Sequence, residues 1–120
     1  MRQFVGAEYV IANLLIRKKK AGQNYVSMEE LILCGVKVQR ILKKNSIDAI
    51  FLTTRDEFYE AIYDFSDFFS CEFDDITGRI KQVEIKDGKN IKDLEDRFVG
   101  YIPEEIVKII EEASNETNVA

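Results

Sequence analysis

Carboxylates are the most numerous side chains in this sequence that could take part in chemistry. Three closely spaced pairs stand out: Asp64/Asp67, Asp74/Asp75 and Asp93/Asp96. Such oxygen ligands can hold Mg²⁺ in principle. None of the pairs, however, lies in a calcium-binding loop or beside a glycine-rich phosphate loop. We therefore interpret them as solvated surface and turn residues and expect no metal site.

The other residue types that commonly carry chemistry are scarce. The sequence has no histidine, which removes the commonest general base and the commonest metal ligand. Its two cysteines, Cys34 and Cys71, are too few for a zinc site or a disulfide framework. Both stand among apolar residues, so we expect buried, reduced thiols. The sequence predicts a protein that is not an enzyme, and it indicates no cofactor and no small-molecule substrate.

Charge is distributed unevenly along the chain. Residues 1–45 hold nine Lys/Arg and three Asp/Glu, a net charge of +6, whereas residues 46–120 hold eight Lys/Arg and nineteen Asp/Glu, a net charge of −11. The two values sum to −5. Asymmetry of this kind suggests one part that faces a polyanion and a second part that faces a different partner.

Two basic groups could contact phosphates. The first is the run Arg17, Lys18, Lys19 and Lys20, which is equally well explained as a helix end where cations offset the carbonyl dipoles. The second lies within residues 27–45. Its order of helix, glycine and helix is similar to the helix-turn-helix motif, with the turn at Gly35. A single core helix with a basic outer face is the alternative.

The second helix of such a motif would span residues 36–44. It would expose side chains that bind phosphates or base edges, namely Lys37, Gln39, Arg40, Lys43 and Lys44. We therefore predict a small regulatory protein that binds nucleic acid through this segment, aided by residues 17–20. Gln39 and Arg40 are the better candidates for base contacts. The acidic half would contact a partner subunit or a second copy of the chain.

The acidic half also supports a hypothesis from a different class. A compact domain rich in carboxylates can mimic nucleic acid or match a basic partner. Small phage or mobile-element proteins that inhibit host nucleases often have such a composition. The protein would then be an inhibitor or adaptor that binds protein through the acidic faces of residues 56–75 and 93–112. The expected partner-binding residues are Tyr59, Tyr63, Asp64 and Asp67, with Tyr101 as a further aromatic anchor.

An α+β fold, a mostly helical single domain with one β-hairpin, is expected to position these residues. Apolar periodicity predicts helices over 5–20, 27–45, 54–65, 91–98 and from Pro103 onward. Ser27/Glu30 and Thr54/Glu57 match the capping-box pattern. A strand is expected over 47–53, and a hairpin from strands 69–73 and 79–86. A basic helix followed by a later hairpin resembles the winged-helix arrangement.

The hairpin should contain an irregularity, because Ile80 is out of phase with Val83 and Ile85. Residues 1–114 should form the globular domain, and residues 115–120 a mobile polar tail. No apolar run reaches the length of a membrane span, and the N-terminal segment lacks the layout of a signal peptide. We therefore expect a cytoplasmic protein.

Overall fold

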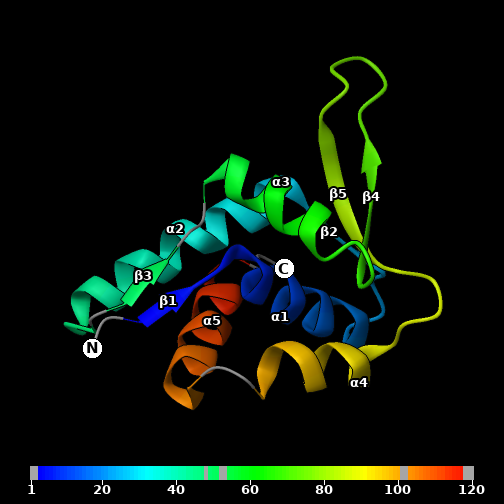
Figure 1. Ribbon diagram of the computed structural model, residues 1–120. Coiled ribbons are helices and arrows are strands. Elements are labelled where there is room, and N and C mark those ends of the chain that lie inside the picture. Colours follow the sequence, from blue (N-terminus) through cyan, green and yellow to red (C-terminus); the bar gives the residue numbers. More distant parts are fainter. Residues whose placement is uncertain (1–2, 48, 52–53, 101–102, 118–120) are drawn as a thin grey trace.

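The computed structural model describes residues 3–47, 49–51, 54–100 and 103–117. The helices are α1 (Ala7–Lys20), α2 (Met28–Lys44), α3 (Arg55–Asp64), α4 (Ile91–Leu94), the π-helical turn η1 (Glu95–Val99) and α5 (Glu104–Thr117). The strands are β1 (Gln3–Val5), β2 (Tyr25–Ser27), β3 (Ala49–Phe51), β4 (Phe69–Phe73) and β5 (Ile80–Ile85). These elements confirm the predicted α+β class (Figure 1).

Side-chain caps fix where the helices begin. Glu30 donates its backbone N–H to Ser27 Oγ at 3.1 Å, and its carboxylate accepts the backbone N–H of Ser27 at 3.3 Å. Thr54 and Glu57 form the same reciprocal pair at the start of α3. Both predicted capping boxes are thus confirmed. A further capping box begins α4 at Asn90. Each box satisfies backbone donors that the first helical turn leaves without a partner.

The strands form two small sheets: the strand expected over 47–53 is present as β3 (Ala49–Phe51), and the expected hairpin has a third strand beside it. β4 and β5 make the predicted antiparallel hairpin, and β2 adds to the other side of β5. β1 and β3 form a separate parallel pair in which Gln3 lies opposite Ala49. Strand β1 was not predicted, because a strand of three residues is too short to show a period of two.

The predicted irregularity in the hairpin is confirmed. Glu72 pairs with Gln82, whereas the next residue of β4, Phe73, pairs with Ile80. Lys81 is therefore the extra residue of a β-bulge, which shifts the facing of the strand by one position. As a result, Ile80 and Val83 are both buried although they are three residues apart.

Helix α1 lies at the centre of the molecule. Residues 10–16 are all buried, so this helix is covered on every side rather than along one face as its sequence period suggested. In Figure 1 the other helices surround it. Neither α1 nor another helix in the described ranges combines the length and the apolar character that crossing a membrane requires.

The C-terminal end departs from expectation. Helix α5 continues through Thr117, past residue 115, where the tail was predicted to start. Ser114 is buried, and Asn115 accepts a hydrogen bond from Arg17. The rest of the predicted tail, residues 118–120, lies outside the described residues.

A cluster of aromatic rings surrounds Phe98 of η1. Phe98 is fully buried, and its ring meets those of Tyr9, Phe65 and Phe68 edge to face, with centroids 5.2–6.1 Å apart. It also stacks on Phe69 at 5.4 Å. Such ring pairs add stability beyond the area that they bury. Phe98 therefore holds α1, α3, β4 and η1 together.

We predict that Phe98→Ala lowers the free energy of unfolding by about 3–5 kcal/mol, because it leaves a cavity among four aromatic rings. Phe73, which is half exposed, is the matched control, and Phe73→Ala should cost roughly 1 kcal/mol or less. Urea denaturation followed by circular dichroism measures both. Equal losses for the two variants would contradict this account of the core.

Candidate nucleic-acid interface

The turn predicted at Gly35 does not form. Residues 28–44 make one uninterrupted helix of 17 residues, with Gly35 buried in its middle. An interior glycine costs about 1 kcal/mol relative to alanine, which the continuous apolar stripe on either side of it easily outweighs. The alternative, a single core helix with a basic outer face, is what the chain adopts. Without the turn, the helix-turn-helix and winged-helix layouts are both absent from this segment.

The outer face of α2 nevertheless presents the predicted cationic residues together. Gln39, Arg40, Lys43 and Lys44 are exposed, and Lys37 is half-buried. Within the part of the chain that the structure describes, Arg40, Lys43 and Lys44 form no ion pair. Lys37 and Gln39 have interactions inside the chain. Three cations in the last two turns thus remain available to an external anion.

The end of α2 is fixed by a local cap. Asn45 donates both its backbone N–H and its side-chain Nδ2 to the carbonyl of Ile41, at 3.0 and 2.9 Å. Ser46 then takes a positive φ of 55°, which turns the chain toward β3. Lys43 and Lys44 lie in the last turn, where cations interact favourably with the carbonyl end of the helix dipole. Their backbone positions are therefore well defined, although their side chains extend into solvent.

The basic run at the end of α1 is arranged differently, because each of its four cations has a partner inside the chain. The contacts are Arg17 with the Asn115 side chain, Lys18 with Glu30 at 2.5 Å, Lys19 with the Asn24 side chain at 2.8 Å and Lys20 with Glu95 at 4.0 Å. The predicted role of this run as an open phosphate-binding patch is therefore weakened. Its structural role, the closing of a central helix, is well supported.

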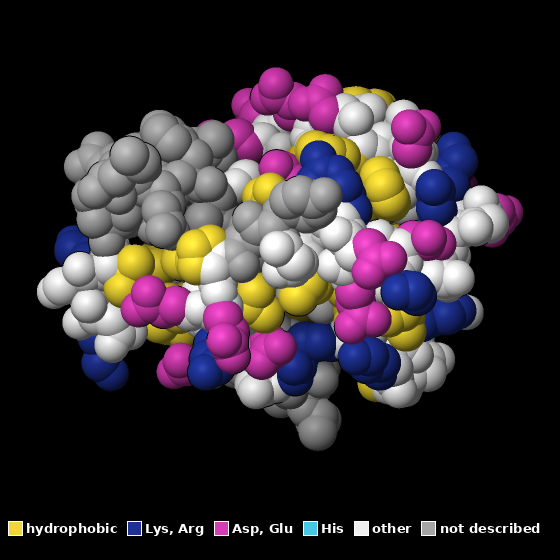
Figure 2. Space-filling view, turned by 60° about the horizontal axis from the view of Figure 1, so that its bottom comes forward, with side chains coloured by type: hydrophobic (Ala, Val, Ile, Leu, Met, Phe, Trp, Pro, Cys, Tyr) yellow, Lys and Arg dark blue, Asp and Glu magenta, His cyan; other side chains and the backbone are white. Residues whose placement is uncertain are grey.

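The two basic groups lie at opposite ends of α2. The Lys18–Glu30 pair holds the end of α1 beside the first turn of α2. Lys44 is 14 residues farther along, about 21 Å at the helical rise per residue. On the face that Figure 2 shows, basic and acidic side chains are intermixed. The charge segregation of the sequence thus does not become one basic surface in the fold.

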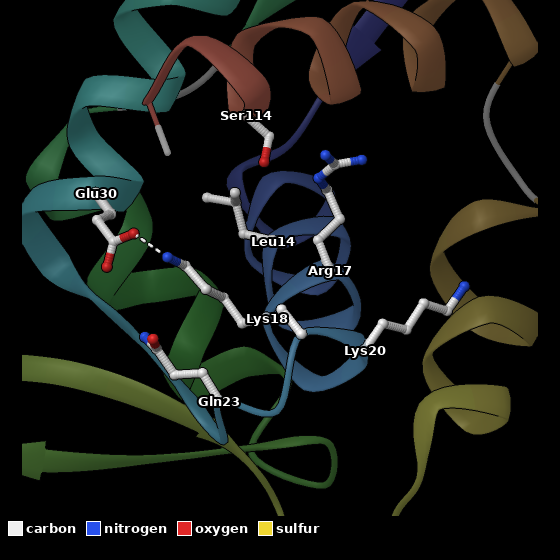
Figure 3. A pocket seen from close by; sticks show the side chains of 8 residues that line it. Leu14, Arg17, Lys18, Lys20, Gln23, Glu30 and Ser114 are labelled. Carbon is white, nitrogen blue, oxygen red and sulfur yellow. Dashed lines mark ion pairs between the residues drawn. The ribbon is translucent and has the colours of Figure 1, made fainter. Parts of the chain in front are cut away.

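A pocket of about 380 Å³ lies at the end of α1. Figure 3 shows Arg17, Lys18 and Lys20 along it, with Ser114 of α5 across from them. Lys18 reaches across to Glu30 on α2, so one of the three charges is neutralised within the wall. Residues from three helices, α1, α2 and α5, line the pocket. Its three cations outnumber its one carboxylate, so the lining has a net positive charge.

The Lys18–Glu30 pair also changes the acidity of Glu30. Partial burial alone would raise the pKa of Glu30, but hydrogen bonds from Lys18 and Ser27 and the charge of Lys18 outweigh it and lower that pKa below its ordinary value of 4.5. A lowered pKa means that the folded state favours the ionised carboxylate. The resulting stability is present above the ordinary pKa and is lost as the pH falls through the lower folded value.

We predict that Lys18→Met lowers the free energy of unfolding by about 1–3 kcal/mol at pH 7, because Glu30 keeps its charge but loses its ionic partner. The control is Lys108→Met, which breaks an exposed pair with Glu104 and should cost about 0.5 kcal/mol or less. Urea denaturation at pH 7 and pH 3 measures both. The Lys18 effect should be smaller at pH 3, which is below the ordinary pKa of Glu30, and a loss that is constant with pH would contradict the proposed pairing.

The residues expected to bind a protein partner are split by the fold. Tyr63 is 59% exposed, and Asp64 and Asp67 are also at the surface. Tyr59, by contrast, packs against the core, and its hydroxyl is buried without a hydrogen-bond partner among the described residues. Tyr59 is therefore half-buried against the core, whereas Tyr63 is the more open of the two tyrosines. Tyr101 lies outside the described residues.

Carboxylates lie along α3 from its first turn to its last residue. Asp64 lines a hollow of about 210 Å³ together with Glu8, Glu57 and Glu60. Across the residues that the structure describes, no group of three or more carboxylate or thiol ligands has an arrangement that could hold a metal ion. The hollow is thus an acidic surface feature of α1 and α3.

The two thiols differ in burial. Cys34 is fully buried, and burial raises its pKa to about 12 despite the nearby charges of Lys37 and Arg17. Cys71 is only half-buried, and burial followed by the charge of Glu84 raises its pKa. The expectation of a buried thiol is confirmed for Cys34 and overstated for Cys71. Neither is a thiolate at neutral pH, as a nucleophile would need to be.

Comparisons with known proteins assign no family to this chain. No protein-family model, curated protein or solved structure matches it. What the protein does is therefore inferred from its own residues and their arrangement.

Proposed function

We propose that this chain is a small, non-enzymatic regulatory protein of the cytoplasm that binds nucleic acid through the outer face of α2. Arg40, Lys43 and Lys44 contact phosphates, and Lys37 adds to the local positive charge. Gln39 and Arg40 are the residues whose donors fit base edges. The observation that carries the proposal is a set of three exposed cations at the end of one continuous helix, which have no ion pair among the described residues.

The anchoring of α2 supports this role. The opposite face of the helix is buried through Leu31, Cys34, Val38 and Leu42, so the cationic face is held in one orientation. A preorganised surface loses little conformational entropy when it binds. The carboxylates of this helix, Glu29 and Glu30, lie in its first turn, far from Lys43 and Lys44. The last two turns therefore have a single sign of charge.

Residues 17–20 have a smaller part in this proposal than the sequence suggested. Lys18 is held by Glu30, and Lys20 faces Glu95. A phosphate would have to compete with these internal partners. The proposed contact is thus confined to one end of α2, which predicts modest affinity and strong dependence on salt.

A protein-binding role remains the second candidate, as an acidic inhibitor or adaptor. One observation favours it: Tyr63 is 59% exposed on α3 and is followed by the exposed carboxylate Asp64. An exposed tyrosine beside acidic residues suits a basic protein surface, such as that of a nuclease. Tyr63→Ala should then abolish capture of a basic partner and leave binding to nucleic acid unchanged.

We predict that duplex DNA or RNA binds with a log K that falls linearly with log[salt], with a slope of about −2 to −4 for the three to four contacting cations. Fluorescence anisotropy with a labelled duplex measures K across a salt series. The double variant Lys43→Glu/Lys44→Glu should weaken binding at least tenfold and flatten the slope by about 2.

The matched control is Lys92→Glu/Lys108→Glu, which makes the same charge change on α4 and α5. It should leave affinity and slope nearly unchanged, because both lysines are on other helices and pair with neighbouring acids. Equal loss for the two double variants would show that overall charge, and not the end of α2, decides binding. A parent protein whose binding is independent of salt would refute the proposal.

A further inference from the structure

Four of the six large exposed apolar side chains among the described residues lie in two places, and the other two are Tyr25 and Tyr63. Phe73 and Ile76, 50% and 94% exposed, lie at the end of the β4–β5 hairpin. Leu33 and Val36, 46% and 47% exposed, lie one turn apart on the outer face of α2. The hairpin projects well beyond the rest of the molecule (Figure 1). We propose that its tip docks on the outer face of α2 in a second copy of this chain.

The tip is held in one conformation before any contact is made. Asp74 Oδ1 accepts the backbone N–H groups of Ile76 and Thr77, each at 2.9 Å. The backbone of Asp74 also bonds with Gly78 and Arg79, at 2.8 and 2.7 Å. Gly78 has a φ of +72°, in the region that glycine adopts without strain. These contacts hold the loop that presents Ile76 to solvent, which reduces the entropy lost on docking.

The two charged residues directly before Ile76 are acidic, whereas the basic residues Arg79 and Lys81 follow it in the chain. Asp74 and Asp75 directly precede Ile76, and hydrogen bonds from the backbone N–H groups of Thr77 and Ile76 lower the pKa of Asp74. An aliphatic side chain next to two carboxylates does not suit nucleic acid, because the phosphates would repel them. It suits an apolar surface that is bordered by cations.

The outer face of α2 has that composition on the side toward the C-terminal end of the helix, whereas Glu29 lies one turn before Leu33. Leu33 and Val36 are three residues apart and so lie on one side of the helix. Lys37 follows Leu33 by four residues, and Arg40 follows Val36 by four residues, so a cation lies one turn beyond each apolar side chain. Ile76 would contact Leu33 and Val36 while Asp75 faces Arg40. This contact pairs apolar with apolar and acidic with basic.

Both surfaces belong to the same chain, which makes a twofold dimer the natural product. In such a dimer each tip docks on the other copy's α2, so one contact forms twice. The docking uses Leu33, Val36 and Arg40, whereas the nucleic-acid contact uses mainly Lys43 and Lys44 at the end of α2, so that Arg40 is the one residue common to both. The two proposals therefore fail separately: variants at the tip test the dimer, and variants at the end of α2 test nucleic-acid binding.

Sedimentation equilibrium of the full chain over a broad concentration series tests the dimer. We expect reversible dimerisation that Ile76→Asp and Leu33→Asp each weaken by tenfold or more. Tyr63→Asp, which changes an equally exposed side chain on α3, is the matched control and should leave the dissociation constant unchanged. Circular dichroism of each variant establishes that it is folded. Ile76→Ser, at a position that contacts almost nothing within the chain, provides a second tip variant.

Mixing experiments sharpen the test. An Ile76→Asp chain keeps an intact α2 face and a Leu33→Asp chain keeps an intact tip, so their mixture should form a heterodimer with one good contact. Asp75→Lys should weaken the dimer, and adding Arg40→Glu to the same chain should restore it. A chain that stays monomeric at all concentrations overturns the proposal. So does a dimer that is insensitive to Ile76→Asp, or a loss of duplex binding caused by Ile76→Asp.

Discussion

The burial of α1 on every side is the constraint on which the rest of the structure depends. A helix whose residues 10–16 all lie in the core must be covered from several directions, and α2, α3, α5, β2 and η1 supply that cover. The polar end of this helix must still reach solvent or a partner. Lys18 does so through Glu30, which is also the residue that closes the capping box of α2. One carboxylate thus connects the central helix to the start of its largest neighbour.

The parts of the fold that could be predicted were those encoded locally. Capping boxes join residues three apart, and the bulge at Lys81 follows from the phase of Ile80 against Val83. The β1–β3 pair could not be predicted, since its partners are distant and each strand has three residues. The turn at Gly35 was predicted wrongly because a local preference of about 1 kcal/mol was weighed without the burial that opposes it. Long-range packing decides such cases.

The candidate site shows the same division. The residue types on α2 and their exposure followed from helical periodicity, so Arg40, Lys43 and Lys44 were found correctly as surface cations. The partners of the α1 run were not predictable, because Asn115 and Glu95 are brought to Arg17 and Lys20 by the tertiary fold. The net charge of +6 over residues 1–45 does not by itself say where the charges lie on the folded surface. Whether these cations form one positive surface depends on which carboxylates from distant parts of the sequence the fold places beside them.

The buried hydroxyl of Tyr59 affects how stable this chain can be. An oxygen without a hydrogen-bond partner among the described residues loses the hydration that it had in the unfolded chain. Phenylalanine would fill the same space without that oxygen, so the natural chain is less stable than its own scaffold allows. A single substitution that removes this oxygen does not require the backbone to move. Such a substitution should therefore raise the temperature at which the chain unfolds.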